Sequence, residues 1–477
     1  MTTKTHRALL LASLAILCFP AGAHAASLLE IYQQALQSDP LIHEAEARRL
    51  ASLEATPQAR SALLPQINAG GSWETSEASG ERVQFDAVQG IFRPIDSASE
   101  SDTTAWNIEL RQSLFRWDQW VTLRQADRRV AQAEVDYELA QQDLIIRVVN
   151  RYLQVLGAED RLTSLNADKL AIARQLEQAK QRFDVGLIAI TDVQESQAAY
   201  DQAVASEIAA KRDLATTREL LREITGEYVT TLSAPGDNFP LMSPDPSDEQ
   251  SWVELALSQN LALVSSRFNE RIARDEIAFR RTGHYPSIDL IASTSSQESD
   301  AEQNVGGGPF FPADSEFEND SIRLQVTVPI FSGGGTSSRV REAVYLHRAS
   351  REQLQRVARE TERGARDAYL GVLSEISRVN ALEQAVSSSR TALEATQAGF
   401  DVGTRTIVDV LNSQFALYAA ITNYYQSRYD YISNVFLLKQ AAGTLRIQDL
   451  EEVDNWLKER QRPEDAIAEA EAEEEAE

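Results

Sequence analysis

Alternation of apolar and polar residues with a period of two marks four segments of the chain as strands. The alternation covers residues 66–74 and 106–111 in one half of the chain, and residues 288–292 and 322–328 in the other. One face of such a strand suits lipid and the other suits water, as in a membrane barrel. The polar segments inside each pair, 76–102 and 298–320, are expected to be loops.

Two long stretches without proline are expected to be helical. Proline is missing between Asp118 and Ala234 and again between Ser332 and Arg462, and both stretches are rich in Ala, Gln, Glu, Arg and Leu. Apolar residues recur every seven positions at the start of the first stretch, at Val130, Tyr137 and Leu144, which indicates coiled-coil packing.

The lengths of these helices are expected to match. A helix from Asp118 to Phe183 would be about 100 Å long at roughly 1.5 Å per residue. Two shorter pieces, residues 28–60 and 192–224, would each be about half as long and could pack beside it. The sequence therefore predicts a hollow cylinder of helices next to the strands.

The chain repeats itself at long range. RFDVGLIAITDV at 182–193 aligns with GFDVGTRTIVDV at 399–410, an offset of 217 residues. A proline-rich segment between the halves has the composition of a linker. We therefore expect a first repeat at 26–230, a linker at 231–249 and a second repeat at 250–450, each repeat with the order helix, two strands, long helix, return helix.

The N-terminus predicts export. Lys4 and Arg7 precede an apolar run, and the run is followed by Pro20 and the small-residue site ending at Ala25, so residues 1–25 are interpreted as a signal peptide. The single cysteine, Cys18, falls inside it, so we expect no disulfide and no lipid anchor. No later segment approaches the roughly 18 apolar residues of a membrane-spanning helix. Membrane insertion would then use strands, which indicates the outer membrane, with the helices extending into the periplasm.

Four strands are too few to close a barrel. An open sheet edge is not tolerated in lipid, so several chains must combine their strands. Two chains would give eight strands and an interior filled by side chains, whereas three would give twelve and room for a lumen. An oligomer in contact with outer-membrane lipid is the expectation, and an export duct would need the homotrimer.

Charge and residue spacing argue against several functions. The net charge of −26 would repel nucleic acid. The five histidines are scattered without metal-ligand spacing, no catalytic constellation is present, and the glycines at 333–335 lack the lysine of a phosphate loop. We expect no enzyme activity, no cofactor and no metal. The acidic tail at 451–477 is expected to be disordered.

Three motifs resemble the TolC family of outer-membrane efflux and type I secretion channel proteins. They are RFDVGLIAITDV at 182–193, GTRTIVDVLNSQFALY at 403–418 and AAGTL at 441–445, and the likeness covers both repeats but not the acidic tail. It implies an α+β membrane protein in which three subunits form one twelve-stranded transmembrane β-barrel, continued by a periplasmic α-helical coiled-coil tunnel. It also implies a passive exit channel of a tripartite efflux pump or a type I secretion system, opened by a periplasmic adaptor (membrane fusion protein) and an inner-membrane transporter.

The resemblance also assigns roles to individual residues. Two valine-glycine turns would form the end of the tunnel at which the adaptor docks. The gate, which closes that end, would be held by Arg405 bonding toward Thr191 and Asp192, with Asp409 of three chains forming an anionic ring. The implied adaptor contacts are Val185, Gly186, Leu187, Val402, Gly403 and Thr404, and the implied gate residues are Asp409, Asn412, Arg405, Phe400, Thr191 and Asp192.

This chain departs from the family pattern at two gate positions. Phe400 stands where a tyrosine makes a closing hydrogen bond, and Asn412 stands where a second ring aspartate would lie. We therefore expect a gate with fewer hydrogen bonds and less negative charge.

Other interpretations stay open at this stage. The two glycines could simply end helices, with Thr191-x-x-Gln194 and Thr406-x-x-Asp409 capping the helices that follow. A non-conducting periplasmic coiled-coil scaffold anchored in the outer membrane is the alternative function, and an exported hydrolase is a third. The sequence does not distinguish small toxic compounds from secreted polypeptides as cargo, nor does it identify the partner pump.

Overall fold

The computed structural model describes residues 25–86, 89–236, 240–305 and 308–458. Apart from Ala25, the expected signal peptide lies outside these ranges. The chain divides into two compact units. A helical unit comprises Met1–Glu46, Tyr137–Val264 and Val357–Glu477, and a sheet unit comprises Ala47–Asp136 and Ser265–Arg356.

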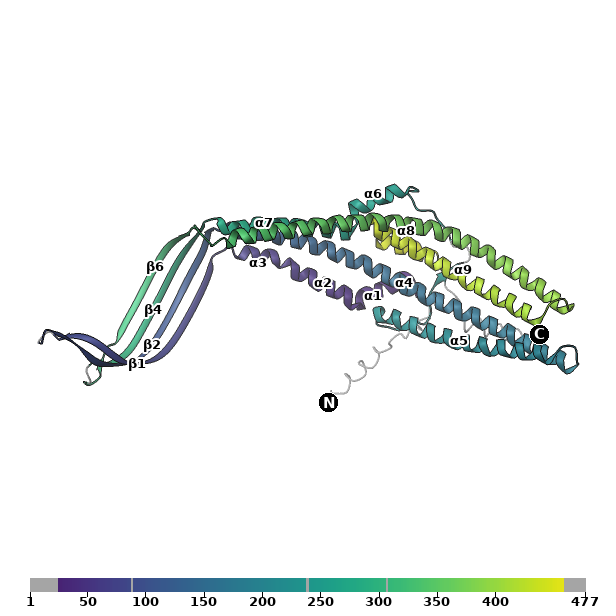
Figure 1. The fold of residues 1–477 in the computed structure, drawn as a ribbon, viewed down its shortest axis with the longest axis horizontal. Coiled ribbons are helices and arrows are strands. Elements are labelled where there is room, and N and C mark those ends of the chain that lie inside the picture. The colour runs from purple at the N-terminus through teal and green to yellow at the C-terminus, as the bar shows by residue number, and fades with distance from the viewer. Residues whose placement is uncertain (1–24, 87–88, 237–239, 306–307, 459–477) are drawn as a thin grey trace, which may run out of the picture. The chain divides into compact units, whose positions relative to one another are not determined.

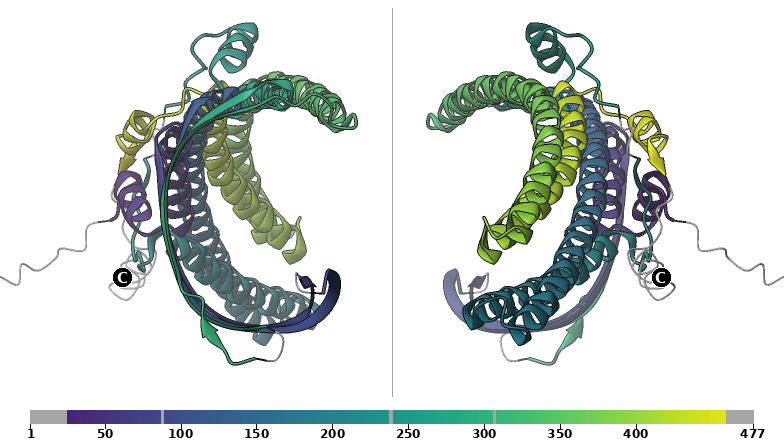
Figure 2. Two further views of the ribbon diagram at one scale, coloured as in Figure 1. Left: turned by 90° about the vertical axis from the view of Figure 1, so that its left-hand side faces the viewer. Right: turned by 90° about the vertical axis from the view of Figure 1, so that its right-hand side faces the viewer.

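The sheet unit contains four long antiparallel strands. They are β1 (Gln66–Asp86), β2 (Ile91–Phe115), β4 (Ser287–Val305) and β6 (Ser315–Thr327), and they lie side by side in the order β1-β2-β4-β6 (Figure 1). The short strand β5 (Phe311–Pro312) pairs with β4, and the sheet curves strongly (Figure 2). The pairing of β2 with β4 joins the two halves of the chain. In the described residues, β1 and β6 each have a long partner strand on one side only.

The loops expected at 76–102 and 298–320 are mostly strand instead. The β1–β2 ladder continues from Gln66↔Arg111 to Asp86↔Ile91, so these strands have 21 and 25 residues. Main-chain hydrogen bonds build a ladder whether or not the side chains are apolar. Polar side chains add cross-strand bonds, such as Thr75 Oγ1 to Asp102 Oδ1 at 2.7 Å. The prediction was wrong because the apolar pattern marks only one part of each strand.

Two long helices and two return helices follow the strands. The long helices α4 (Trp117–Asp184) and α8 (Gly335–Asp401) have 68 and 67 residues. The return helices α5 (Ile190–Thr225) and α9 (Ile407–Ala442) have 36 each. None of the helices in the described ranges combines the length and apolar composition that a membrane crossing requires.

The segment expected to be one helix over 28–60 is three. It forms α1 (Leu28–Ser38), α2 (Pro40–Leu53) and α3 (Ala55–Ser61). The first break occurs at Asp39, whose backbone is extended because proline disfavours the helical conformation in the preceding residue. The second half has α6 (Glu249–Gln259), α7 (Leu261–Arg281) and the short 3-10 helix η1 (Thr282–His284) in the equivalent place.

The core of the helical unit is built around large buried side chains. Tyr152 of α4 and Tyr431 and Phe436 of α9 are fully buried, together with Leu28 and Ile31 of α1. The Tyr152 hydroxyl donates to the carbonyl oxygen of Ser233 at 2.6 Å. Part of the segment expected to be linker is therefore tied to the core.

Part of the tail expected to be disordered, residues 451–458, is folded. Helix α10 (Ile447–Asp454) buries Leu450 and Val453, and β7 (Leu457–Lys458) pairs with β3 (Ala234–Pro235). Burial of these apolar side chains stabilises this segment against the helical unit. The rest of the predicted tail, 459–477, lies outside the described residues.

Candidate functional site

Two hairpin turns carry most of the residues singled out in the sequence. Residues 185–189 join α4 to α5, residues 402–406 join α8 to α9, and both turns lie at the same end of the helical unit (Figure 1). In the first turn, Gly186 has φ of 77°. The Gly186 N–H donates to Phe183 O at 2.8 Å, and the Leu187 N–H donates to Arg182 O at 2.9 Å. This is a Schellman motif, whose left-handed residue favours glycine.

The second turn repeats the first bond for bond. Gly403 has φ of 76°. Its N–H donates to Phe400 O at 3.0 Å, and the Thr404 N–H donates to Gly399 O at 2.8 Å. The helix-ending role of both glycines is thus confirmed, which explains the glycine of FDVG in both halves.

Apolar side chains on the turns are exposed without a local reason. Val185, Leu187 and Val402 have exposed fractions of 71%, 74% and 75%. The Schellman bonds use only their backbone. These three side chains are therefore accessible to another molecule.

The helices after the turns begin differently. Thr406 caps α9 through a reciprocal capping box with Asp409, in which each side chain accepts from the other residue's backbone N–H. Helix α5 begins after Ala189, which makes no side-chain cap, so Thr191 lies inside its first turn. The cap expected at Thr191 is therefore wrong, and the cap expected at Thr406 is confirmed.

The capping box sets the charge of Asp409. Its carboxylate accepts from the Thr406 backbone N–H at 2.9 Å and from the Thr406 hydroxyl at 3.0 Å. These bonds, and more weakly the charge of Arg405, lower the pKa of Asp409. Asn412 is exposed three residues further on, and so lies on the same face of α9.

Arg405 packs against the end of α8. A Cβ placed on Gly399 would lie 2.8 Å from Arg405 Cγ, so the missing side chain of this glycine admits the arginine. Within the described part of one chain, no hydrogen bond or ion pair joins Arg405 to Thr191 or Asp192. The expected bond is not formed inside the subunit.

A residue that the sequence analysis missed connects the two hairpins. Arg182, in the last turn of α4, places Nη2 3.1 Å from Asp401 Oδ1. Its guanidinium carbon also lies 5.0 Å from the centroid of the Phe400 ring, a cation–π contact. The signal was present, because Arg182 aligns with Gly399 in the repeat and is the position at which RFDVG and GFDVG differ.

A buried polar cluster ties α9 to α4 further along the hairpins. Gln414 is almost fully buried and its amide donates to Asp168 Oδ1 at 2.8 Å, while Gln175 donates to the Gln414 oxygen at 2.8 Å. Burial raises the pKa of Asp168, and the Gln414 bond opposes that rise. Separating α9 from α4 here would leave buried polar groups unpaired, which costs about 1 to 3 kcal/mol for each group.

No cluster suited to a metal ion is found among the ionisable side chains that the structure describes. In the ranges described above, no group of three or more His, Cys, Asp or Glu side chains has a geometry that could hold a metal ion. The site is a pair of turns with exposed apolar residues, charged side chains and hydrogen-bonded caps.

A protein-family model matches both halves of the chain. The model of the family "Outer membrane efflux protein" matches residues 31–227 and again residues 252–444. The outer membrane protein TolC of Vibrio cholerae is 38% identical over 436 residues, covering 91% of this chain and 94% of that protein. TolC of Escherichia coli is 35% identical over 451 residues, covering 94% and 88%. The alkaline protease secretion protein AprF of Pseudomonas aeruginosa is 29% identical over 435 residues, covering 90% and 87%.

Among solved structures, the outer membrane protein VceC of Vibrio cholerae has a TM-score of 0.68 at 18% identity, covering 87% of this chain and 96% of VceC. This likeness establishes the fold. The expected fold class, long helices joined to the antiparallel strands of an outer-membrane channel protein, is confirmed.

Proposed function

Because this chain belongs to the outer membrane efflux protein family and is an outer-membrane exit channel for efflux or secretion, we propose that it works as a homotrimer opened by a periplasmic adaptor and an inner-membrane transporter. The chain lies in the outer membrane and extends into the periplasm. In this proposal the channel is a passive conduit and performs no catalytic step.

The open edges of the sheet carry the trimer proposal. Strands β1 and β6 each have a free edge along most of their length in the described chain. Free edges in lipid leave backbone groups unpaired, so copies of the chain must pair β1 of one with β6 of the next. Three copies supply twelve strands, enough for a lumen.

The gate proposal places closure at the two hairpin turns. Because Arg405 makes no bond to Thr191 or Asp192 within one chain, its closing bond would reach these residues in a neighbouring subunit. Asp409 would face the lumen as a ring of three carboxylates, with Asn412 as a neutral second ring.

Arg182 strengthens the gate inside each subunit. It holds the ends of α4 and α8 together through Asp401 and Phe400. The phenylalanine that replaces the family tyrosine cannot donate a hydrogen bond, but it offers a ring face to the guanidinium. A different bond would thus keep the same hairpins together.

The exposed apolar residues of the turns would be the adaptor contact. Val185, Leu187 and Val402 stand out from the helix ends, and burying each against an adaptor would stabilise the complex by about 1 to 2 kcal/mol. Thr404 takes part mainly in the turn itself, where its hydroxyl donates to Gly399 O at 3.0 Å.

Bilayer recordings of the purified protein test this function. A trimeric channel should give discrete single-channel currents and particles of three chains by light scattering in mild detergent. A scaffold that does not conduct would give trimers without current, and a stable monomer with full strand content would contradict the sheet-edge argument. Deletion in the native host, scored for drug sensitivity and for secreted proteins, would identify the cargo.

A further inference from the structure

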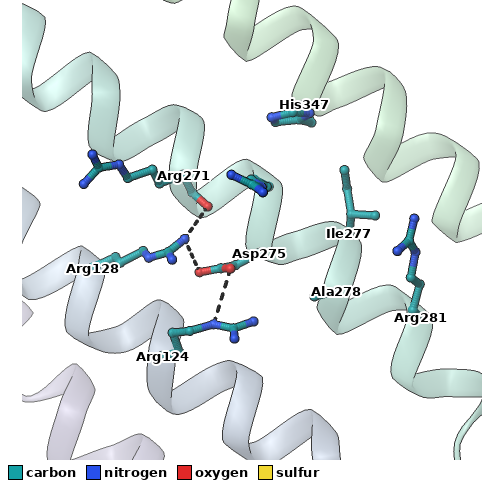
Figure 3. A pocket seen from close by; sticks show the side chains of 9 residues that line it. Arg124, Arg128, Arg271, Asp275, Ile277, Ala278, Arg281 and His347 are labelled. Carbon is teal, nitrogen blue, oxygen red and sulfur yellow. Dashed lines mark hydrogen bonds and ion pairs between the residues drawn. The ribbon is translucent and has the colours of Figure 1, made fainter.

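The sheet unit contains a hollow whose charge is opposite to that of the chain. It has a volume of about 630 Å³ and is lined by side chains of α4, α7 and α8 (Figure 3). Among its lining residues Asp275 is the one acid, while the chain as a whole has a net charge of −26. The arginines that line it are Arg124, Arg128, Arg271, Arg274 and Arg281.

One buried carboxylate organises this arginine pocket. The side chain of Asp275 is only 8% exposed, and its oxygens lie 3.4 Å from Arg124 Nε and 2.5 Å from Arg128 Nη1. Arg128 Nη1 also donates to the backbone oxygen of Arg271 at 2.9 Å (Figure 3). Asp275 therefore fixes two guanidinium groups while neutralising one charge.

The remaining positive charge of the pocket is uncompensated. In the part of the chain that the structure describes, Arg271, Arg274 and Arg281 have no carboxylate within ion-pair distance. The two nearby acids are engaged elsewhere, since Glu270 lies 2.6 Å from His347 Nε2 and Glu276 lies 2.7 Å from Arg280 Nε. Several guanidinium groups around one hollow are suited to phosphate, which they bind through paired N–H donors.

The pocket lies beside the membrane strands. Helix α7 ends at Arg281 and β4 begins at Ser287, so about 20 Å of extended chain at most separates them. On α4, exposed Trp120 is followed by Arg124 and Arg128 at intervals of four residues, which places all three on one face. Tryptophan is enriched at the membrane–water interface, where its ring lies at headgroup level, and Arg124 and Arg128 share the helix face of Trp120.

We propose that the arginine pocket binds the phosphate of an anionic phospholipid headgroup in the inner leaflet of the outer membrane. The lipid would anchor the sheet unit at a fixed depth, with Arg271, Arg274 and Arg281 contacting the phosphate and Asp275 holding the other two arginines in place. The shared face with Trp120 favours a lipid over a dissolved phosphate. This inference rests on the outer-membrane location and is independent of the gate.

Native mass spectrometry of the detergent-purified protein tests the site. The protein would be mixed with phosphatidylglycerol or with neutral phosphatidylcholine. Phosphatidylglycerol should bind preferentially. Arg274→Gln combined with Arg281→Gln should lower the affinity for phosphatidylglycerol at least tenfold, because the loss of each charge-assisted bond lowers the binding constant by roughly a factor of ten. Arg339→Gln with Arg341→Gln removes two exposed arginines of α8 that do not line the hollow, and this control should bind normally.

Three results would overturn the proposal. The first is that the control variant loses as much phosphatidylglycerol binding as the Arg274→Gln, Arg281→Gln variant. The second is that the protein binds phosphatidylcholine as well as phosphatidylglycerol. The third is that inorganic phosphate binds and phosphatidylglycerol does not displace it. If the double variant does not fold, the single variants Arg274→Gln and Arg281→Gln, both at exposed positions, should each show a smaller loss. Single-channel current should remain in every variant, so a failed lipid site would not be confused with a failed channel.

Discussion

Arg182 Nη2 and Asp401 Oδ1 lie 3.1 Å apart and join the last turn of α4 to the last residue of α8. The two side chains are 35% and 50% exposed, so solvent screens the pair and its contribution is about 0.2 to 1 kcal/mol. A contact of this strength holds two hairpins together and still releases them. The three copies of a trimer would add to at most about 3 kcal/mol.

Breaking this pair should favour the open channel. Arg182→Gln removes both the charge for Asp401 and the cation–π contact with Phe400, together at most about 2 kcal/mol, so the ratio of open to closed channels should rise up to about thirtyfold per subunit. Single-channel recording measures this. Exchanging the charges, with Arg182→Asp and Asp401→Arg together, should restore part of the closed state. An exchange that behaves like the single variant would argue against a direct pair.

Removing Arg405 should have a larger effect. If it bonds across a subunit boundary, Arg405→Ser loses a charge-assisted bond of roughly 1.5 to 3 kcal/mol per subunit. Conductance should increase and larger antibiotics should pass. Arg390→Ser, an exposed arginine on α8 away from the turns, is the matched control and should conduct like the unmodified protein. Equal currents from Arg405→Ser and the control would exclude Arg405 from the gate.

A ring of Asp409 should concentrate cations at the mouth of the channel. Asp409→Asn removes the charge but keeps an oxygen that can accept from the Thr406 N–H, and it leaves the Thr406 cap on the Asp409 N–H in place, so block by multivalent cations should weaken without loss of the helix start. Asn412→Asp should tighten the block, and added salt should reduce the change because exposed charges are screened over about 8 Å. Currents recorded with divalent or trivalent cations on the periplasmic side measure this. Unchanged block in both variants would mean that α9 does not line the mouth.

The pH dependence of this block follows from the capping box. Thr406 lowers the pKa of Asp409, so its charge and the capping bonds are fully present above the ordinary value of 3.8 and are lost only as the pH falls below it. Thr406→Ala removes the hydroxyl donor, and cation block should then disappear at a higher pH. Recordings in a pH series would measure the pH at which the block disappears in each protein. If that pH is the same in Thr406→Ala and in the unmodified protein, the capping box does not control the charge of the Asp409 ring.

The exposed apolar residues of the turns should matter for export and not for assembly. Leu187→Ser and Val402→Ser leave the Schellman bonds intact, because those bonds use the backbone. Efflux or secretion in cells should fall while trimer yield and bilayer current stay normal. Leu41→Ser, at an exposed apolar position on α2, is the control. Normal export by both turn variants would place the adaptor contact elsewhere.

The sequence alone determined the local elements and the pattern of the site. Absence of proline marked the long helices, and period-two alternation marked the parts of the strands that carry apolar residues. The repeated FDVG identified both turns, because a left-handed residue after a helix needs glycine wherever it occurs. Each of these features depends only on residues a few positions apart, so it can be recognised in the sequence without knowing the fold.

The tertiary structure decided what depends on residues far apart in the chain. Strand β2 pairs with β4, and Arg182 contacts Asp401, although the paired residues are at least 170 positions apart in the chain. Helix α10 packs into the same core as α1, which comes from the opposite end of the chain. The strands also extend through polar segments, because a ladder depends on its partner's backbone and not on apolar side chains. Such contacts arise from the sum of many weak interactions across the fold. No local pattern in the sequence records which of them are formed.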